Sequence, residues 1–308
     1  MSRADGSRPV AIAAPTRPVP LRPMSLADLL DGAFRLLKLH GPMLLGYALV
    51  IVGPLQLASI YLQREFISGG GGVWRTLTRP AGTGFGDTAG TLPQGAQLAI
   101  TIAQLVVIVP LLAGAVAAIA GRAALGEQVD NASILRTTVR RAPAVLVTAL
   151  LVHVLEFGLV LAGVGAIALG APGLGAFLIG IGVLVAFLVM PLFVVAVPVL
   201  VNERGGPFVA VRRSIRLLKP RYGATLGAAV VSALMAGFLG LAVAGLPGAV
   251  SLLMGRYGWI AVGAGSVLSS LVSLPFVTLV ATLIYLDARI RQEGLDLELM
   301  TREFLDAR

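Results

Sequence analysis

The stretch VRRSIRLLKPR, residues 211–221, decides the fold of this chain. It is basic, it has the apolar spacing of an amphipathic helix, and it leads into an uncharged apolar segment, residues 224–246. The letters RLLK within it, residues 216–219, occur once more at residues 35–38, again just before a long apolar segment. A basic amphipathic helix followed by an apolar segment of this length is typical of a membrane protein, where the helix lies at the surface and the segment crosses the bilayer.

The composition places the whole chain in the membrane class. Of its 308 residues, 57% are hydrophobic and only 13% are charged, and the mean hydropathy is +0.91. A helix needs about 20 apolar residues to cross a hydrocarbon core roughly 30 Å thick. Six segments are long enough: residues 43–62, 96–120, 144–170, 174–201, 224–246 and 260–286. We therefore predict an all-α membrane protein with six transmembrane helices. Prolines inside the longer segments predict kinks, at Pro110, Pro191, Pro198 and Pro275.

The repeated letters indicate that the bundle is built from similar units. An offset of 181 residues aligns RLLK with RLLK and continues with identical residues at Leu45, Gly46 and Ala48. A looser third copy, residues 132–143, precedes the third span. Each unit would be a cytoplasmic interfacial helix followed by a helical hairpin, so that three repeated hairpin units give six spans. The alternative is chance, because any multi-spanning protein places basic amphipathic residues at the cytoplasmic ends of its spans.

The positive charges predict the orientation. One side of the predicted bundle, which includes both termini, holds 20 of the 24 Lys and Arg residues, and the other side holds Arg64, Arg75, Arg79 and Arg256. Because Lys and Arg near the spans stay on the cytoplasmic side, we place both termini in the cytoplasm. With only two lysines and abundant Arg, Ala and Gly, the composition favours a bacterial source. We therefore expect a multi-pass protein of the bacterial cytoplasmic (inner) membrane.

The chain divides into three parts. Residues 1–23 carry arginines among prolines and lack an apolar core, so we predict a disordered cytoplasmic tail rather than a signal peptide. Residues 24–300 form the transmembrane domain, which opens on an interfacial helix that Ser25 and Asp28 cap. Residues 301–308 form a cytoplasmic C-terminal tail. At residues 285–297 the last span continues into a region of mixed charge, which predicts a solvated helix end that docks on neighbouring loops.

The net charge of +9 points to anionic lipids and not to nucleic acid, because the excess lies next to the spans. Each basic side chain near the surface of an anionic membrane contributes about 1 kcal/mol of attraction. We expect contacts with anionic headgroups at the cytoplasmic face from Arg35, Lys38, Arg136, Arg140, Arg212, Arg216 and Lys219. Other membrane proteins are possible partners.

His153 and Glu156 are the only ionisable side chains well inside a span. They are three residues apart and so share a helix face, and a charge at that depth is costly unless it is partnered or neutralised. Gln104 and Gln97 are the best candidates for a cross-helix partner. One interpretation is a proton or cation relay, or a polar contact for a substrate headgroup. The other is a mutually satisfied pair that fixes helix packing.

No motif predicts catalysis, a metal or a cofactor. The chain has no Cys and two His, His40 and His153, which leaves too few ligands for a zinc site. Neither G-x-S-x-G nor H-E-x-x-H occurs, and the glycine runs at residues 69–72 and 82–86 are not followed by the Lys of a phosphate-binding loop. We therefore expect no catalytic residue, no metal site and no cofactor.

Two stretches carry a family resemblance, residues 22–35 (RPMSLADLLDGAFR) and residues 285–297 (YLDARIRQEGLDL). Together with Arg212, Arg213 and Ser214, they make the chain similar to bacterial proteins that resemble the membrane domain of glycerophosphoryl diester phosphodiesterase. The resemblance spans residues 22–300 and implies a six-helix membrane module. It does not extend to the catalytic barrel of the namesake, so it implies no phosphodiesterase activity and no catalytic residue.

We expect a non-enzymatic scaffold or accessory subunit in a cell-envelope or lipid-related process. The alternative is a transporter or channel for a lipid or small solute that uses His153 and Glu156 inside the membrane.

The predicted orientation can be tested with single cysteines, because the chain has none of its own. A membrane-impermeant thiol reagent applied to intact cells should label Thr78→Cys and should leave Thr137→Cys unlabelled until the membrane is opened. A permeant reagent should label both variants and serves as the control. The reverse labelling pattern would overturn the orientation.

Overall fold

The computed structural model describes residues 22–64, 94–203 and 205–295, and all regular secondary structure in these ranges is helical. Six helical segments are long and apolar enough to cross a membrane, which confirms the predicted class of all-α membrane protein. Both predicted tails lie almost entirely outside the described residues. The elements in chain order are α1 (Leu26–Leu39), α2 (Gly41–Leu62), α5 (Gln94–Ile102), η1 (Ala103–Ile108), α6 (Val109–Ala124), α7 (Asn131–Ala168), α8 (Pro172–Phe193), α9 (Ala196–Asn202), α10 (Pro207–Leu218), η2 (Lys219–Arg221), α11 (Tyr222–Ser251), η3 (Gly255–Tyr257) and α12 (Gly258–Glu293).

The segment predicted as the first interfacial helix forms a separate helix, α1, with the predicted capping box. The hydroxyl of Ser25 accepts a hydrogen bond from the backbone N–H of Asp28, and the carboxylate of Asp28 accepts one from the backbone N–H of Ser25 at 2.9 Å. These bonds to Ser25 hold the pKa of the Asp28 carboxyl below its usual value. The cap therefore contributes stability above the ordinary pKa of an aspartate and loses it as the pH falls through the lowered pKa.

The stretch at residues 211–221 also lies mostly in a separate amphipathic helix, α10, which leads through η2 into the long helix α11. A proline lies where each amphipathic helix gives way to the following span. Pro42 lies in the first turn of α2, after α1, and Pro220 lies within η2, between α10 and α11. The segment predicted as a looser third copy behaves differently, and the threefold repeat stays a prediction. Residues 132–143 are the first part of α7, which continues without a break through Pro143 into the span. An internal proline is tolerated in a spanning helix where neighbouring groups replace the lost backbone bond.

Two of the four prolines predicted to cause kinks lie near a change of helix type or a break between helices. The π-helix η1 immediately precedes Pro110 near the start of α6, and α8 ends two residues after Pro191, before α9 begins. A π-turn before proline moves the preceding carbonyl away from the ring that would clash with it. Pro198 and Pro275 lie inside continuous helices, α9 and α12.

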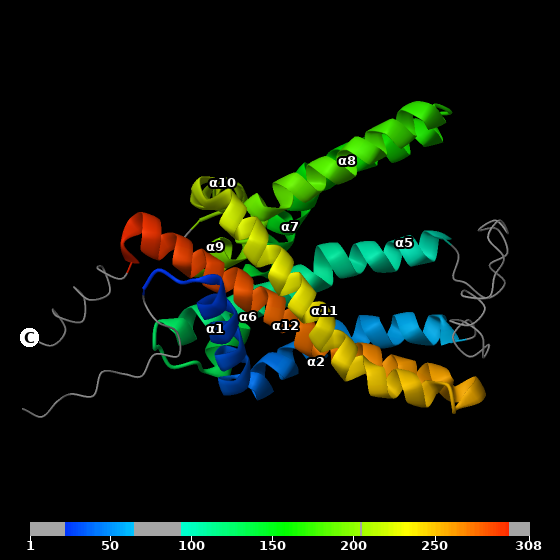
Figure 1. Cartoon of the computed structure of the whole chain (residues 1–308), viewed down its shortest axis with the longest axis horizontal. Helices are drawn as coiled ribbons and strands as arrows, with labels where there is room; N and C mark the ends of the chain where they lie inside the picture. Colours follow the sequence, from blue (N-terminus) through cyan, green and yellow to red (C-terminus); the bar gives the residue numbers. More distant parts are fainter. Residues whose placement is uncertain (1–21, 65–93, 204, 296–308) are drawn as a thin grey trace, which may run out of the picture.

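The helices pack closely at one end of the bundle and diverge at the other (Figure 1). We call the end that carries α1, α10 and the C-terminal part of α12 the basic end. The buried apolar side chains gather toward it, from α1, the first half of α2, the second half of α6, α9, α10 and α12. The C-terminal half of α12 runs through the middle of this core, where Phe276, Leu283 and Tyr285 are fully buried.

At the other end α7 and α8 form an antiparallel hairpin that extends away from the rest of the bundle (Figure 1). Glycines let the two helices touch: a Cβ on Gly175 would lie 2.6 Å from the carbonyl oxygen of Gly163. The third and fourth spans are therefore antiparallel neighbours. The outer faces of the hairpin expose large apolar side chains such as Leu161 and Phe177, as expected of surfaces that meet lipid.

Candidate functional site

His153 lies half-buried on α7 and is engaged within its own helix. Its ring nitrogen Nδ1 is 2.7 Å from the carbonyl oxygen of Ala149, and its ring stacks on Phe157 with 6.0 Å between the centroids. Among the described residues it forms no bond with Glu156. The predicted mutual pair of His153 and Glu156 is therefore not formed in this structure.

Glu156 is only 8% exposed, although it lies in a spanning helix. Its carboxyl group makes no hydrogen bond or ion pair with any described residue. Gln104, the predicted partner, is half-buried on η1, which packs beside α7, but no hydrogen bond joins the two within the described ranges. The side chain of Gln97 lies outside the described residues. The burial of Glu156 without a partner favours its neutral, protonated form, because an isolated charge inside the membrane is costly.

The polar groups that the structure does bring together lie at the basic end, around Asp287. Its carboxylate accepts hydrogen bonds from the backbone N–H of Met24 at 2.7 Å, from Nη1 of Arg221 at 3.2 Å and from Nε of Arg291 at 2.8 Å. Nη2 of Arg291 also donates to the carbonyl oxygen of Met24 at 2.9 Å. We call Met24, Arg221, Asp287 and Arg291 the Asp287 cluster. It ties the start of α1 and the junction of α10 with α11 to the end of α12.

A second group, the Glu203 cluster, lies on α10 and α12 and on the residue that follows α9. Arg213 pairs with Glu203 and, at 2.8 Å, with Glu293, which also pairs with Arg289 at 3.0 Å. The buried hydroxyl of Tyr285 donates to the carboxylate of Glu203 at 3.0 Å. The cluster therefore joins three separate parts of the chain through ion pairs.

Both clusters contain residues of the C-terminal stretch at 285–297, which we predicted from the sequence to be a solvated helix end. That prediction is wrong for its first turns, since Tyr285 is fully buried and Asp287 is 8% exposed. The helix packs on α1 and α10, and its polar side chains also bind Met24 and Glu203, which lie outside the helices. Docking on neighbouring connections is therefore observed. The four-residue spacings of Asp287 with Arg291 and of Arg289 with Glu293 were visible in the sequence. Such pairs are equally common on solvated helices, so the spacing alone could not identify their burial.

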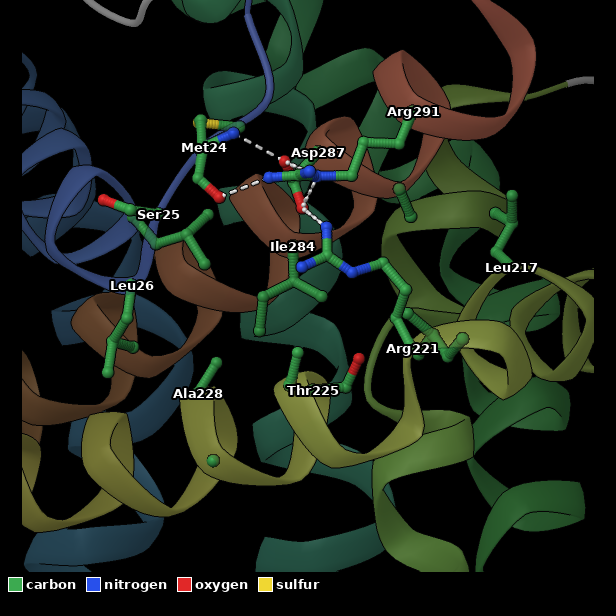
Figure 2. Close-up of a pocket in the computed structure, with 15 residues that line it drawn as sticks. Met24, Ser25, Leu26, Leu217, Arg221, Thr225, Ala228, Ile284, Asp287 and Arg291 are labelled. Carbon is green, nitrogen blue, oxygen red and sulfur yellow. Dashed lines mark hydrogen bonds and ion pairs between the residues drawn. The ribbon is translucent and has the colours of Figure 1, made fainter.

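A cavity of about 360 Å³ opens beside the Asp287 cluster, between α1, the end of α10, the first turns of α11 and the end of α12. Figure 2 shows Arg291, Asp287 and Arg221 along one edge, with Ile284 next to Asp287 and Arg221. Thr225 and Ala228 lie below them in the same view. The cavity thus has one charged edge and otherwise mostly apolar walls.

All seven basic residues predicted to meet lipid headgroups are exposed: Arg35, Lys38, Arg136, Arg140, Arg212, Arg216 and Lys219. Arg35 also pairs with Asp31 at 2.7 Å on the surface of α1. Their exposure leaves them free to reach headgroups, and their contact with lipid stays a prediction. Within the described ranges no three or more His, Cys, Asp or Glu side chains are grouped so that they could hold a metal ion.

The Asp287 cluster predicts that a conservative substitution of Asp287 lowers the free energy of unfolding substantially. Asp287→Asn keeps the shape of the side chain but leaves two arginines without a counter-charge, and we expect the free energy of unfolding to fall by about 3 kcal/mol. Asp31→Asn, which removes an exposed pair, should cost less than about 1 kcal/mol and is the matched control. Reversible unfolding in mixed micelles measures both. Equal effects of the two substitutions would contradict the role given to Asp287.

Comparison of the chain with protein-family models, with curated proteins and with solved structures found no match. The similarity to the membrane domain of glycerophosphoryl diester phosphodiesterase therefore stays a prediction from short motifs.

Proposed function

We propose that this multi-pass membrane protein is a non-enzymatic scaffold or accessory subunit of the bacterial cytoplasmic membrane, acting in a cell-envelope or lipid-related process. Both termini would lie in the cytoplasm, at the basic end of the bundle. The family resemblance of residues 22–35 and 285–297 is consistent with such a membrane module.

One observation carries the proposal: the carboxylates of the two clusters at the basic end form ion pairs that join helices. Asp287, Glu203 and Glu293 are each paired with arginines from another helix or from the same helix one turn away. A carboxylate that acts as a general acid or base must instead be within reach of a substrate and free to change its protonation state. The exposed arginines and lysines around these clusters, such as Arg212 and Arg216, suit a protein that is held against anionic lipid.

An accessory role predicts that the protein has a specific lipid or protein binding partner in the membrane. We expect the protein, extracted directly into native lipid nanodiscs from its source cells, to carry one lipid class or one membrane protein reproducibly enriched. An unrelated six-span protein extracted in the same way is the control, and mass spectrometry of lipids and proteins is the measurement. If nothing is enriched over the control in repeated preparations, the accessory role is contradicted.

A second candidate is a transporter or channel for a lipid or small solute. It rests on Glu156, a buried carboxyl group in α7 without a hydrogen-bond or ion-pair partner among the described residues. Proton relays in transporters use buried carboxyl groups of this kind.

This candidate predicts a proton flux that depends on Glu156. In liposomes loaded with a pH-sensitive dye, the wild-type protein should collapse an imposed pH gradient, and Glu156→Gln should slow the collapse about tenfold or more, because the amide cannot exchange a proton. Glu127→Gln removes an exposed carboxylate outside the spans and should behave as wild type. A rate that Glu156→Gln leaves unchanged, or a wild-type rate no faster than that of empty liposomes, excludes the relay.

A further inference from the structure

We propose that the cavity beside the Asp287 cluster binds one anionic phospholipid, with its phosphate at Arg221 and Arg291 and the start of its acyl chains on the apolar walls. The inference rests on the proposed lipid-related role and assigns it to one place in the fold. Four features of the cavity support it: charge, lining, a free hydroxyl group and position.

The charged edge of the cavity carries an excess of one positive charge. Two guanidinium groups, Arg221 and Arg291, face the single carboxylate of Asp287. Each guanidinium has five N–H donors, and within the described chain Arg221 uses one nitrogen, Nη1, and Arg291 two, Nε and Nη2. Donors therefore remain on both side chains, and phosphate is the anion that the planar arginine fork matches best after carboxylate.

The other walls suit hydrocarbon rather than water. Large apolar side chains line much of the cavity: Leu26, Leu29, Leu217 and Ile284. On the α11 side the lining residues Gly227, Ala224 and Ala228 have small side chains or none, which leaves space in the cavity. The volume of about 360 Å³ lies in the range of small-molecule pockets. It has room for a headgroup and the first carbons of its chains. A free phosphate ion would leave most of this apolar surface uncovered.

The side chain of Thr225 gives an independent indication of a polar ligand. It lines the cavity, and its hydroxyl group makes no hydrogen bond to the described part of the chain. Although the residue as a whole is 4% exposed, this oxygen is not among the buried unpaired polar atoms, so it is accessible. An accessible hydroxyl group on the cavity wall can donate a hydrogen bond to a ligand oxygen. In Figure 2 Thr225 lies next to Arg221 and below Asp287, so one phosphate group could contact both the hydroxyl and the guanidinium group.

The position of the cavity is that of a lipid headgroup. It lies where the basic segment at residues 211–221 gives way to the uncharged span, and its wall residues Ala224 and Gly227 are exposed on the outer face of α11. Lipid can therefore reach it sideways from the bilayer. The exposed Arg212, Arg216 and Lys219 on the same segment would concentrate anionic lipid near the opening.

Two variants test the two halves of the site. Arg221→Gln removes one phosphate donor and leaves Asp287 paired with Arg291 and Met24, so the fold is retained. Gly227→Phe places an apolar ring at the cavity wall without touching a charge, and no atom lies within 4 Å of the added Cβ. The controls are Arg216→Gln, an exposed arginine outside the cavity, and Gly245→Phe, an equally open position about 27 Å further along α11.

The full chain, purified in a non-ionic detergent, is titrated with dioctanoyl phosphatidylglycerol, with dioctanoyl phosphatidylcholine and with inorganic phosphate, and native mass spectrometry counts the bound molecules. Thermal unfolding confirms that each variant is folded. We expect one phosphatidylglycerol to bind more tightly than phosphatidylcholine, with inorganic phosphate unable to displace it. Arg221→Gln should weaken phosphatidylglycerol binding about tenfold, the loss of one charge-assisted contact. Gly227→Phe should weaken the binding of both lipids. The two control variants should change the affinity for either lipid by no more than about twofold.

Three results would overturn the inference. Unchanged phosphatidylglycerol binding in both cavity variants would place the lipid elsewhere, while the proposed accessory role would stand. Equal binding of the two lipids would remove the anionic selectivity. Displacement by equimolar inorganic phosphate would make the cavity a site for a free anion. Failure of the proposed function is seen separately, in nanodiscs that enrich no lipid or protein.

Discussion

The structure depends on one carboxylate, that of Asp287, and on the three groups that bind it. The backbone N–H of Met24, Arg221 and Arg291 approach it from different parts of the chain. Helices in lipid have no hydrophobic driving force for association, because the lipid is as apolar as the buried side chains, and they rely on close packing and polar contacts. Polar contacts at the membrane surface can therefore decide which helices stay together. Asp287 makes such contacts at the point where α1, α10, α11 and α12 meet.

The Glu203 cluster repeats this arrangement a short way along α12 and closes the same end of the bundle. The opposite end has no comparable network among the described residues, and there the α7–α8 hairpin diverges from the other helices (Figure 1). One end is thus fixed by ion pairs and a packed core, and the other is held mainly by close pairwise contacts such as Gly163 with Gly175. The protein therefore has a basic surface at its closely packed end and an apolar helical hairpin that extends from the rest of the bundle.

Much of the fold could be predicted because it follows from local patterns. Apolar length predicted the six spans, the spacing of Ser25 and Asp28 predicted the cap of α1, and amphipathic spacing predicted the exposure of basic residues such as Arg216. The candidate site was predicted less well, because burial of a charge depends on partners far away in the chain. Asp287 binds Met24 across 263 residues, and no short pattern contains that contact. The continuity of α7 through Pro143 likewise depends on its surroundings and not on the proline alone.

A double-mutant cycle between Asp287 and Arg221 tests the central claim most directly, because it isolates the interaction from the other effects of each substitution. The free energy of unfolding is measured for the wild type, Asp287→Asn, Arg221→Gln and the double variant in the same mixed micelles. If the carboxylate and the guanidinium hold α11 and α12 together, the coupling energy should be about 1–3 kcal/mol in favour of the pair. A coupling energy of zero, with the two single effects simply adding, would contradict the account.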